Sequence, residues 1–126
     1  MRDFVQDISA YAKGINPGFE VIPQNGQELL TEDGEEAGPP EWSYLNAIDG
    51  VGREDLYYGY DRDNVPTPVS ERDYMITFLD MAENKGIEVL VADYCWTPSF
   101  VDDSYAESAS KGYISFAADH RELDSI

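Results

Sequence analysis

The chain has 126 residues, of which 42% are hydrophobic and 13% aromatic. This apolar content is enough for one folded domain and too high for a disordered acidic chain. The 26 acidic residues outnumber 8 basic ones, which gives a formal net charge of -18. Such a charge repels nucleic acid and anionic membranes, so we expect no nucleic-acid partner and no membrane partner, whereas a cationic ligand would be attracted. Adaptation of the whole surface to high salt explains the same charge without any ligand.

The reactive residue types also limit the chemistry. Cys95 is the only cysteine, so no internal disulfide can form, and His120 is the only histidine. Neither a zinc-type ligand cluster nor a Cys/His catalytic pair is therefore expected. The chain has no phosphate-binding glycine loop and no P-loop lysine, which disfavours nucleotide binding. We expect neither a metal nor any other cofactor.

The first 13 residues predict an amphipathic helix, with Phe4, Val5, Ile8 and Ala12 on one face. The sequence contains no basic segment followed by an apolar run and no stretch of about twenty apolar residues. As written, the chain is expected to be soluble and cytoplasmic. A longer precursor would instead allow an extracellular location.

Strands and helices alternate along the rest of the chain. The apolar runs predict four strands, at residues 19–23, 47–51, 87–92 and 113–118. Further helices are predicted at residues 70–85 and 102–111, the first opened by Ser70 and an acid three residues later. Residues 31–41, rich in acids, Gly and Pro, predict an acidic surface loop. This alternation favours an α/β fold with a parallel sheet.

In parallel sheets, ligands bind at the carboxyl ends of the strands. Each predicted strand is followed by polar residues there: Gln24 and Asn25, then Glu54 and Asp55, then Asp93 and Tyr94, then Asp119, His120 and Arg121. Each has an ordinary structural explanation, since Asn25 precedes a glycine as in many turns and Asp93 could cap a loop. Their convergence on one edge favours a binding site.

Residues 48–59 are the most informative stretch. A short apolar run meets two glycines, then Glu54 and Asp55, then aromatic residues. If the segment is extended, successive side chains leave it on opposite faces, so at most one of these two carboxylates points into a cleft. A solvated acidic turn is the alternative interpretation.

Four segments carry a resemblance: Pro17 to Leu30, Tyr44 to Gly59, Val91 to Cys95, and Arg121 to Asp124. They resemble the C-terminal half of glycoside hydrolase family 114, the endo-alpha-1,4-polygalactosaminidase-like barrels. The resemblance implies half of a (β/α)8 TIM barrel, with four βα units corresponding to strands five to eight, in a single partial domain over residues 1–126. The loop at residues 31–40 departs from the family and is interpreted as an insertion.

The resemblance implies hydrolysis of alpha-1,4-linked galactosamine polymers, with Glu54 as the acid/base glutamate. The family's other catalytic carboxylate, an aspartate after the fourth strand, belongs before Met1. Glycosidases use two carboxylates, one with a raised pKa, and Glu54 beside tyrosines suits that proton donor. We expect a polysaccharide or amino-sugar ligand, bound by Gln24, Asn25, Tyr58, Asp93, Tyr94 and Arg121.

Two other functions remain open. Without the second carboxylate, the chain could be a non-catalytic carbohydrate-binding or assembly fragment. A small doubly wound domain of the response-regulator type has a similar length, but it needs a fifth strand and an acidic cluster early in the chain. A half barrel exposes one sheet face and two strand edges, so we expect the isolated chain to be inactive and to self-associate or pair with an N-terminal half.

Overall fold

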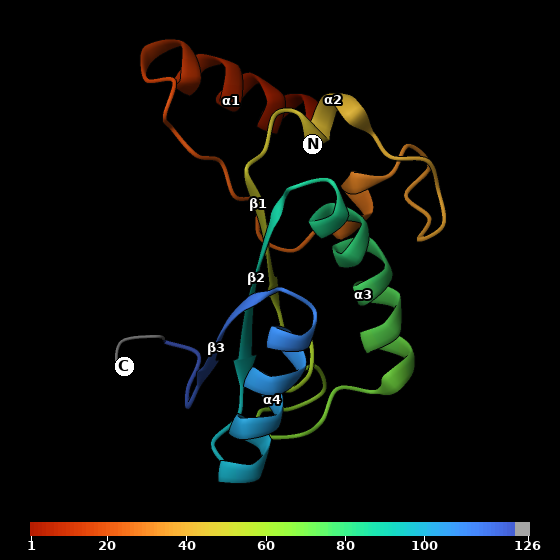
Figure 1. The fold of residues 1–126 in the computed structure, drawn as a ribbon, viewed down its shortest axis with the longest axis vertical. Coiled ribbons are helices and arrows are strands. Elements are labelled where there is room, and N and C mark those ends of the chain that lie inside the picture. Colours follow the sequence, from red (N-terminus) through yellow and green to blue (C-terminus); the bar gives the residue numbers. More distant parts are fainter. Residues whose placement is uncertain (123–126) are drawn as a thin grey trace.

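The computed structural model describes residues 1–122. Its elements, in chain order, are α1 (Arg2–Ile15), the 3-10 helix η1 (Gln27–Leu30), α2 (Trp42–Leu45), β1 (Gly50–Glu54), α3 (Val69–Asn84), β2 (Glu88–Tyr94), α4 (Pro98–Ser110) and β3 (Ile114–Ala118). The strands of this described part form one parallel sheet in the order β1-β2-β3, drawn in Figure 1. The predicted α/β fold with a parallel sheet is therefore confirmed. Of the segment from Arg121 to Asp124, Leu123 and Asp124 lie outside the described residues.

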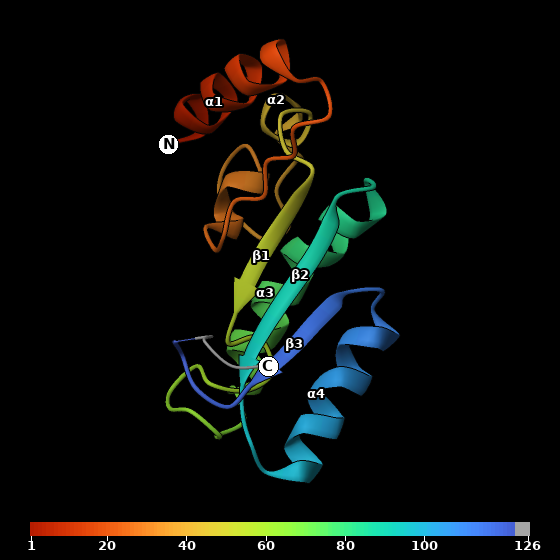
Figure 2. The same ribbon diagram turned by 90° about the vertical axis from the view of Figure 1, so that its left-hand side faces the viewer.

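Helices α3 and α4 cover the same face of the sheet (Figures 1 and 2). The strand β2 buries Val89 and Val91 in the hydrophobic core, to which α3 contributes Phe78 and Leu79. Helix α3 ends before Gly86, whose φ of +82° places it in the left-handed region that glycine adopts without strain. The chain then enters β2 directly. The core therefore lies between the sheet and its helices and leaves the other sheet face open.

The predicted strand at residues 19–23 is wrong. This segment contacts β1 through a single parallel bridge between Gln24 and Gly52, in which the Gly52 amide donates to the Pro23 carbonyl at 2.8 Å. Pro23 has no N–H to extend the ladder, and Asn25 turns the chain away with a φ of +59°. Three strands form in the described residues where four were predicted.

The strand predicted at residues 47–51 forms three residues later, at Gly50–Glu54. Residues Trp42–Leu45 form the short helix α2 instead of leading into the strand, and Asp49 ends this turn by accepting from the Val21 amide at 2.8 Å. Glu54 is consequently the last residue of β1 and not a loop residue. Helix α4 begins four residues earlier than predicted because Pro98 suits the first helical turn.

Helix α1 is amphipathic, but its predicted apolar face is divided. Phe4 and Ile8 are exposed, whereas Ser9 is buried and donates to the Ala47 carbonyl at 2.5 Å. Residues 31–41 contain no helix or strand and are closed by an isolated bridge between Thr31 and Pro40. Within the described residues, no helix is both long and apolar enough to span a membrane.

Candidate functional site at the carboxyl edge of the sheet

A groove of about 320 Å³ lies on the sheet face that α3 and α4 leave open. All three strands and the extended segment beside β1 line it. Its floor is mainly apolar, with Leu90, Ala92 and Phe116, while Glu54 and Tyr94 line it where β1 and β2 end. An apolar floor with a few polar groups at one end is typical of a small-molecule site.

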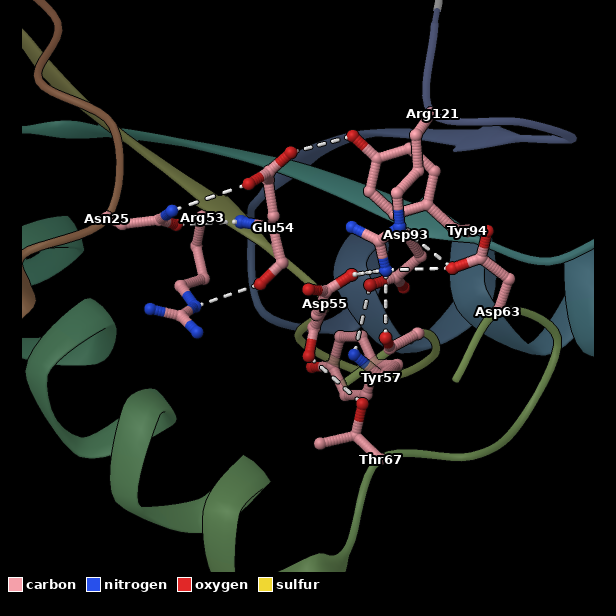
Figure 3. A network of polar contacts seen from close by, with 11 residues as sticks. Asn25, Arg53, Glu54, Asp55, Tyr57, Asp63, Thr67, Asp93, Tyr94 and Arg121 are labelled. Carbon is pink, nitrogen blue, oxygen red and sulfur yellow. Dashed lines mark hydrogen bonds and ion pairs between the residues drawn. The ribbon is translucent and has the colours of Figure 1, made fainter. Parts of the chain in front are cut away.

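The Glu54 carboxylate is the centre of the polar end. Its Oε1 accepts a hydrogen bond from the Tyr94 hydroxyl at 2.7 Å, and its Oε2 lies 3.4 Å from the Asn25 amide nitrogen, which donates (Figure 3). The hydrogen bond from Tyr94 is the main cause that lowers the pKa of Glu54, with partial burial opposing it. Asn25, Gln24 and Arg121 lower this pKa further. Glu54 is therefore ionised at neutral pH.

The neighbouring carboxylate of Asp55 points elsewhere. Asp55 has a φ of +60°, and its Oδ1 lies 3.1 Å from the Arg121 guanidinium. Burial raises the pKa of Asp55, while Arg121 opposes that increase. Glu54 lines the groove and Asp55 does not, so only one of the two carboxylates faces it, as expected. Because β1 ends at Glu54 and Asp55 has a positive φ, the turn after the strand directs the Asp55 side chain away.

Arg121 packs behind the groove and does not line it. Its guanidinium donates to Asp63 at 2.9 Å and to the Gly59 carbonyl at 2.9 Å, in addition to its pairing with Asp55. It also lies over the Tyr94 ring, 4.2 Å from the centroid. One face of the Tyr94 ring is consequently occupied by a cation and is not free to stack on a sugar.

Asp93 and Tyr58 lie on the helix-covered face. Asp93 is fully buried and accepts hydrogen bonds from the Tyr57 amide at 3.0 Å and the Ser104 hydroxyl at 2.6 Å. Burial is the main cause that raises the pKa of Asp93, against the lowering effect of these hydrogen bonds. Tyr58 is also buried, and its hydroxyl donates to Asp103 at 2.7 Å.

The structure therefore divides the residues expected at the site. Gln24, Glu54 and Tyr94 line the groove. Asn25 is bonded to Glu54 beside it, and Arg121 lies over the Tyr94 ring. Asp93 is within one residue of Ala92, the partner of Glu54 across the β1–β2 ladder, but its side chain points to the opposite face.

Two residues of the loop between β1 and α3 were not singled out from the sequence. Asp63 pairs with Arg121, and Asn64 accepts hydrogen bonds from the Trp96 and Thr97 amides at 2.9 and 3.0 Å. Asn64 has a φ of +62°, a conformation that Asn tolerates better than most residues. An Asp-Asn pair inside a long loop is a turn signal, but it does not show which distant residues the turn will hold. No three or more His, Cys, Asp or Glu side chains gather as metal ligands within residues 1–122.

Fold and site together define an α/β protein with an ionised carboxylate at the carboxyl edge of a parallel sheet. No family model matches the chain. Over its whole length it is 33% identical to an uncharacterized protein of Methanocaldococcus jannaschii and 26% identical to one of Deinococcus radiodurans, covering 36% and 37% of those proteins. It is also 28% identical over 94% of its length to an uncharacterized protein of Thermotoga maritima, covering 36% of it. The chain spans a little over a third of the length of these relatives.

Proposed function

We propose that this chain corresponds to strands five to eight of a (β/α)8-barrel glycoside hydrolase of family 114 type, with an extended segment in the position of the fifth strand. In this proposal the complete protein cleaves alpha-1,4-linked galactosamine-type polysaccharide, with Glu54 as one of its two reacting carboxylates. The observation that carries the proposal is the position of Glu54. It ends a parallel strand at the mouth of an apolar groove and is held by Tyr94 and Asn25.

The layering of the fold supports a partial barrel. A (β/α)8 barrel has helices outside its strands and apolar side chains inside, with catalytic groups at the carboxyl ends of the strands. Here α3 and α4 lie on one face, and the other face is open and lined by residues such as Leu90, Ile114 and Phe116. A doubly wound domain, by contrast, carries helices on both faces of its sheet. In this proposal, the extended segment around Gln24, which is bridged to Gly52, corresponds to the fifth barrel strand.

The exposed apolar surface supports a partner for this sheet. Ile114 is 56% exposed and Phe116 is 37% exposed, both on the open face of β3. Apolar side chains on an uncovered sheet favour association. We propose that the remaining strands of the barrel cover this face, and that a second copy covers it when they are absent. Sedimentation of the isolated chain then shows oligomers, whereas a stable monomer at all concentrations contradicts this part of the proposal.

The lowered pKa of Glu54 means that the rest of the barrel must supply a second carboxylate. An ionised carboxylate suits a nucleophile or a general base, and the lowered pKa of Glu54 favours either role in this chain. A proton donor requires a raised pKa. A second carboxylate about 5 to 9 Å away, as glycosidases use, raises the pKa of its neighbour by repulsion between like charges. The acid/base role of Glu54 therefore depends on that second carboxylate.

The groove also fits an amino sugar. The amide of Gln24, which lines the groove, is a suitable hydrogen-bond partner for hydroxyl groups, and the apolar floor can accept a sugar face. A protonated amine is attracted by the ionised Glu54 and by the net charge of -18.

A chimaera tests the proposal. The chain replaces the matching third of the Methanocaldococcus jannaschii relative, and reducing ends released from alpha-1,4-galactosaminan are measured beside the unmodified relative. We expect hydrolysis, lowered by a factor on the order of 10² or more in Glu54→Gln, as loss of proton transfer usually produces. Asp61→Asn, at an exposed acid of the loop after β1, is the matched control and should retain most of the rate. Full activity of Glu54→Gln together with a damaged Asp55→Asn would overturn the assignment.

A second candidate is a non-catalytic carbohydrate-binding protein. Of the two adjacent acids, only the ionised Glu54 faces the groove, because Asp55 is paired with Arg121 and lies outside it. A groove with one carboxylate favours binding, since glycosidases use two. Calorimetric titration of the chain with a galactosamine oligosaccharide separates the candidates. Binding that Glu54→Gln abolishes, with no hydrolysis by the chimaera or by the unmodified relative, supports the binding function.

A further inference from the structure

Arg121 is held by the loop after β1 through its Nε and Nη2 atoms, although the sequence suggests a ligand-binding arginine. Its guanidinium contacts Asp55, Asp63 and the Gly59 carbonyl, so its donors point to the loop after β1 and not to the groove. Figure 3 shows it between these acids and the Tyr94 ring. An arginine whose planar fork is satisfied by two carboxylates and a carbonyl acts as a fixed brace, because moving it breaks several charge-assisted bonds at once.

The brace joins two parts of the chain that carry the site. Tyr94 ends β2, and its carbonyl accepts from the Asn64 amide at 2.8 Å, which ties the strand end to the same loop. Gly59 approaches Asp55 so closely that a Cβ there would lie 2.6 Å from Asp55 Oδ1, and its φ is +114°. Only glycine fits at this position without strain. The loop is therefore shaped to bring its acids and a carbonyl to the guanidinium.

Two contacts hold the Tyr94 side chain, one at its ring face and one at its hydroxyl. The guanidinium lies 4.2 Å from the ring centroid, within the range of a cation–π interaction, and the hydroxyl donates to Glu54 at 2.7 Å. We infer that Arg121 is a positioning residue that acts on Glu54 through Tyr94, fixing the ring so that its hydroxyl stays on Glu54 Oε1. The inference rests on the proposed function only in taking Glu54 as the reacting carboxylate.

The surroundings of Glu54 define what a test must separate. The amides of Asn25 and Gln24, the Tyr94 hydroxyl and the Arg121 charge all lower its pKa. Asp55 lies behind it, and Arg53 of its own strand donates to the Glu54 carbonyl and to Gln27. Arg121 can therefore influence Glu54 by its charge or by placing Tyr94. Loss of an acid that holds Arg121 separates the two effects. With Arg121 in place, the lost negative charge lowers the pKa of Glu54, whereas a weaker Tyr94 hydrogen bond raises it.

Asp63→Ala distinguishes them in the chain as it exists. The side-chain carboxyl of Glu54 is followed by ¹³C NMR during a pH titration, with Glu54→Gln used to assign the signal. Removing an acid lowers the pKa of Glu54 by electrostatics alone. We expect instead that the pKa of Glu54 rises, because the brace loosens and the Tyr94 hydrogen bond weakens. Asp61→Ala is the matched control, since Asp61 is an exposed acid of the same loop. It should leave the pKa of Glu54 unchanged or slightly lower.

A double-mutant cycle provides a second, independent measurement. Arg121→Gln should raise the pKa of Glu54 when Tyr94 is present and by less than half as much in Tyr94→Phe. Arg121→Lys keeps the charge but loses the planar fork, so it should behave like Arg121→Gln. Amide spectra verify that each variant is folded. If Arg121→Gln does not fold, Asp63→Ala and Arg121→Lys still decide the question.

Either of two results overturns the inference. One is a fall in the pKa of Glu54 in Asp63→Ala, and the other is an equal effect of Arg121→Gln in both backgrounds, since each shows action through charge alone. None of these titrations requires turnover. Loss of hydrolysis in the chimaera with an intact Tyr94-dependent titration would therefore refute the proposed function and leave the positioning role in place.

Discussion

Two carboxylates near strand ends, one on each face of the sheet, differ in exposure and in the direction of their pKa shift. Glu54 ends β1 on the open face, where it is partly exposed and its pKa is lowered chiefly by the Tyr94 hydrogen bond. Asp93, one residue before the end of β2, is 0% exposed on the helix-covered face, and burial raises its pKa. The Glu54 carboxylate thus lines an open groove, whereas the Asp93 carboxylate lies in the interior of the fold.

The difference follows from the alternation of side chains along a strand. Asp93 and Tyr94 are neighbours in sequence, yet Tyr94 reaches Glu54 while Asp93 reaches Ser104 of α4. The buried carboxylate also accepts from the Tyr57 amide, which fastens the loop after β1 to the covered face. Asp93 holds the loop from the covered face, whereas Glu54 lines the groove on the open face.

Replacing each carboxylate in turn should give the largest contrast in stability. Asp93→Ala leaves the Tyr57 amide and the Ser104 hydroxyl buried without their acceptor, so we expect a loss of about 3 kcal/mol in the free energy of unfolding. Glu54→Gln keeps hydrogen-bonding capacity in a partly exposed position and should cost less than about 1 kcal/mol. Urea unfolding measures both. Equal losses would show that Glu54 is as much a structural residue as Asp93.

Most of the fold was predictable because its periodic segments are long and well bounded. Helix α3 was expected at residues 70–85 and forms at Val69–Asn84, and β3 was expected at 113–118 and forms at Ile114–Ala118. The largest errors lie at residues 19–51, and smaller ones shift the start of α4 and the end of β2. Within residues 19–51, Pro23 and Asn25 interrupt the hydrogen-bond ladder of the predicted strand. The helix α2 has four residues, too few for a helical repeat of apolar residues to be recognised in the sequence.

The site was predictable in outline but not in its division between faces. The nearness of Glu54 and Asn25 was expected from the polar residues that follow the predicted strands, although the strand predicted before Asn25 does not form. Which of Asp93 and Tyr94 faces the groove depends on how far β2 continues, and the strand was expected to end at residue 92 whereas it runs to Tyr94. The brace of Arg121 depends on the loop conformation at Asp55 and Gly59, both at positive φ. Local sequence does not determine such distant partners.

The two carboxylates should also give opposite pH dependences of stability. The pKa of Asp93 is raised above 3.8, so its contribution to stability is complete below that value and is lost as the pH rises through its folded-state pKa. The pKa of Glu54 is lowered below 4.5, so its contribution is complete above that value and is lost as the pH falls through its folded-state pKa.

Asp93→Asn should therefore cost more stability in acid than at neutral pH, and Glu54→Gln should cost more at neutral pH than in acid. Urea unfolding of both variants and the parent chain across this range measures the two slopes. Slopes of the same sign would mean that both carboxylates have similar surroundings, contrary to the contrast between the faces.

The smallest expected effect concerns a hydroxyl on the covered face. Tyr57 is buried, and its hydroxyl is the phenol that lacks a hydrogen-bond partner among the described buried side chains, while burial raises its pKa to about 12 and keeps it protonated. Tyr57→Phe removes an uncompensated polar group and should leave stability unchanged or raise it by up to about 1 kcal/mol. Tyr113→Phe is the matched control, because the Tyr113 hydroxyl donates to Asp80 at 2.6 Å and its loss should cost about 1 kcal/mol. Equal losses in urea unfolding would show that the Tyr57 hydroxyl is hydrogen-bonded, as by a buried water, and that the covered face is less dry than the contrast with the groove requires.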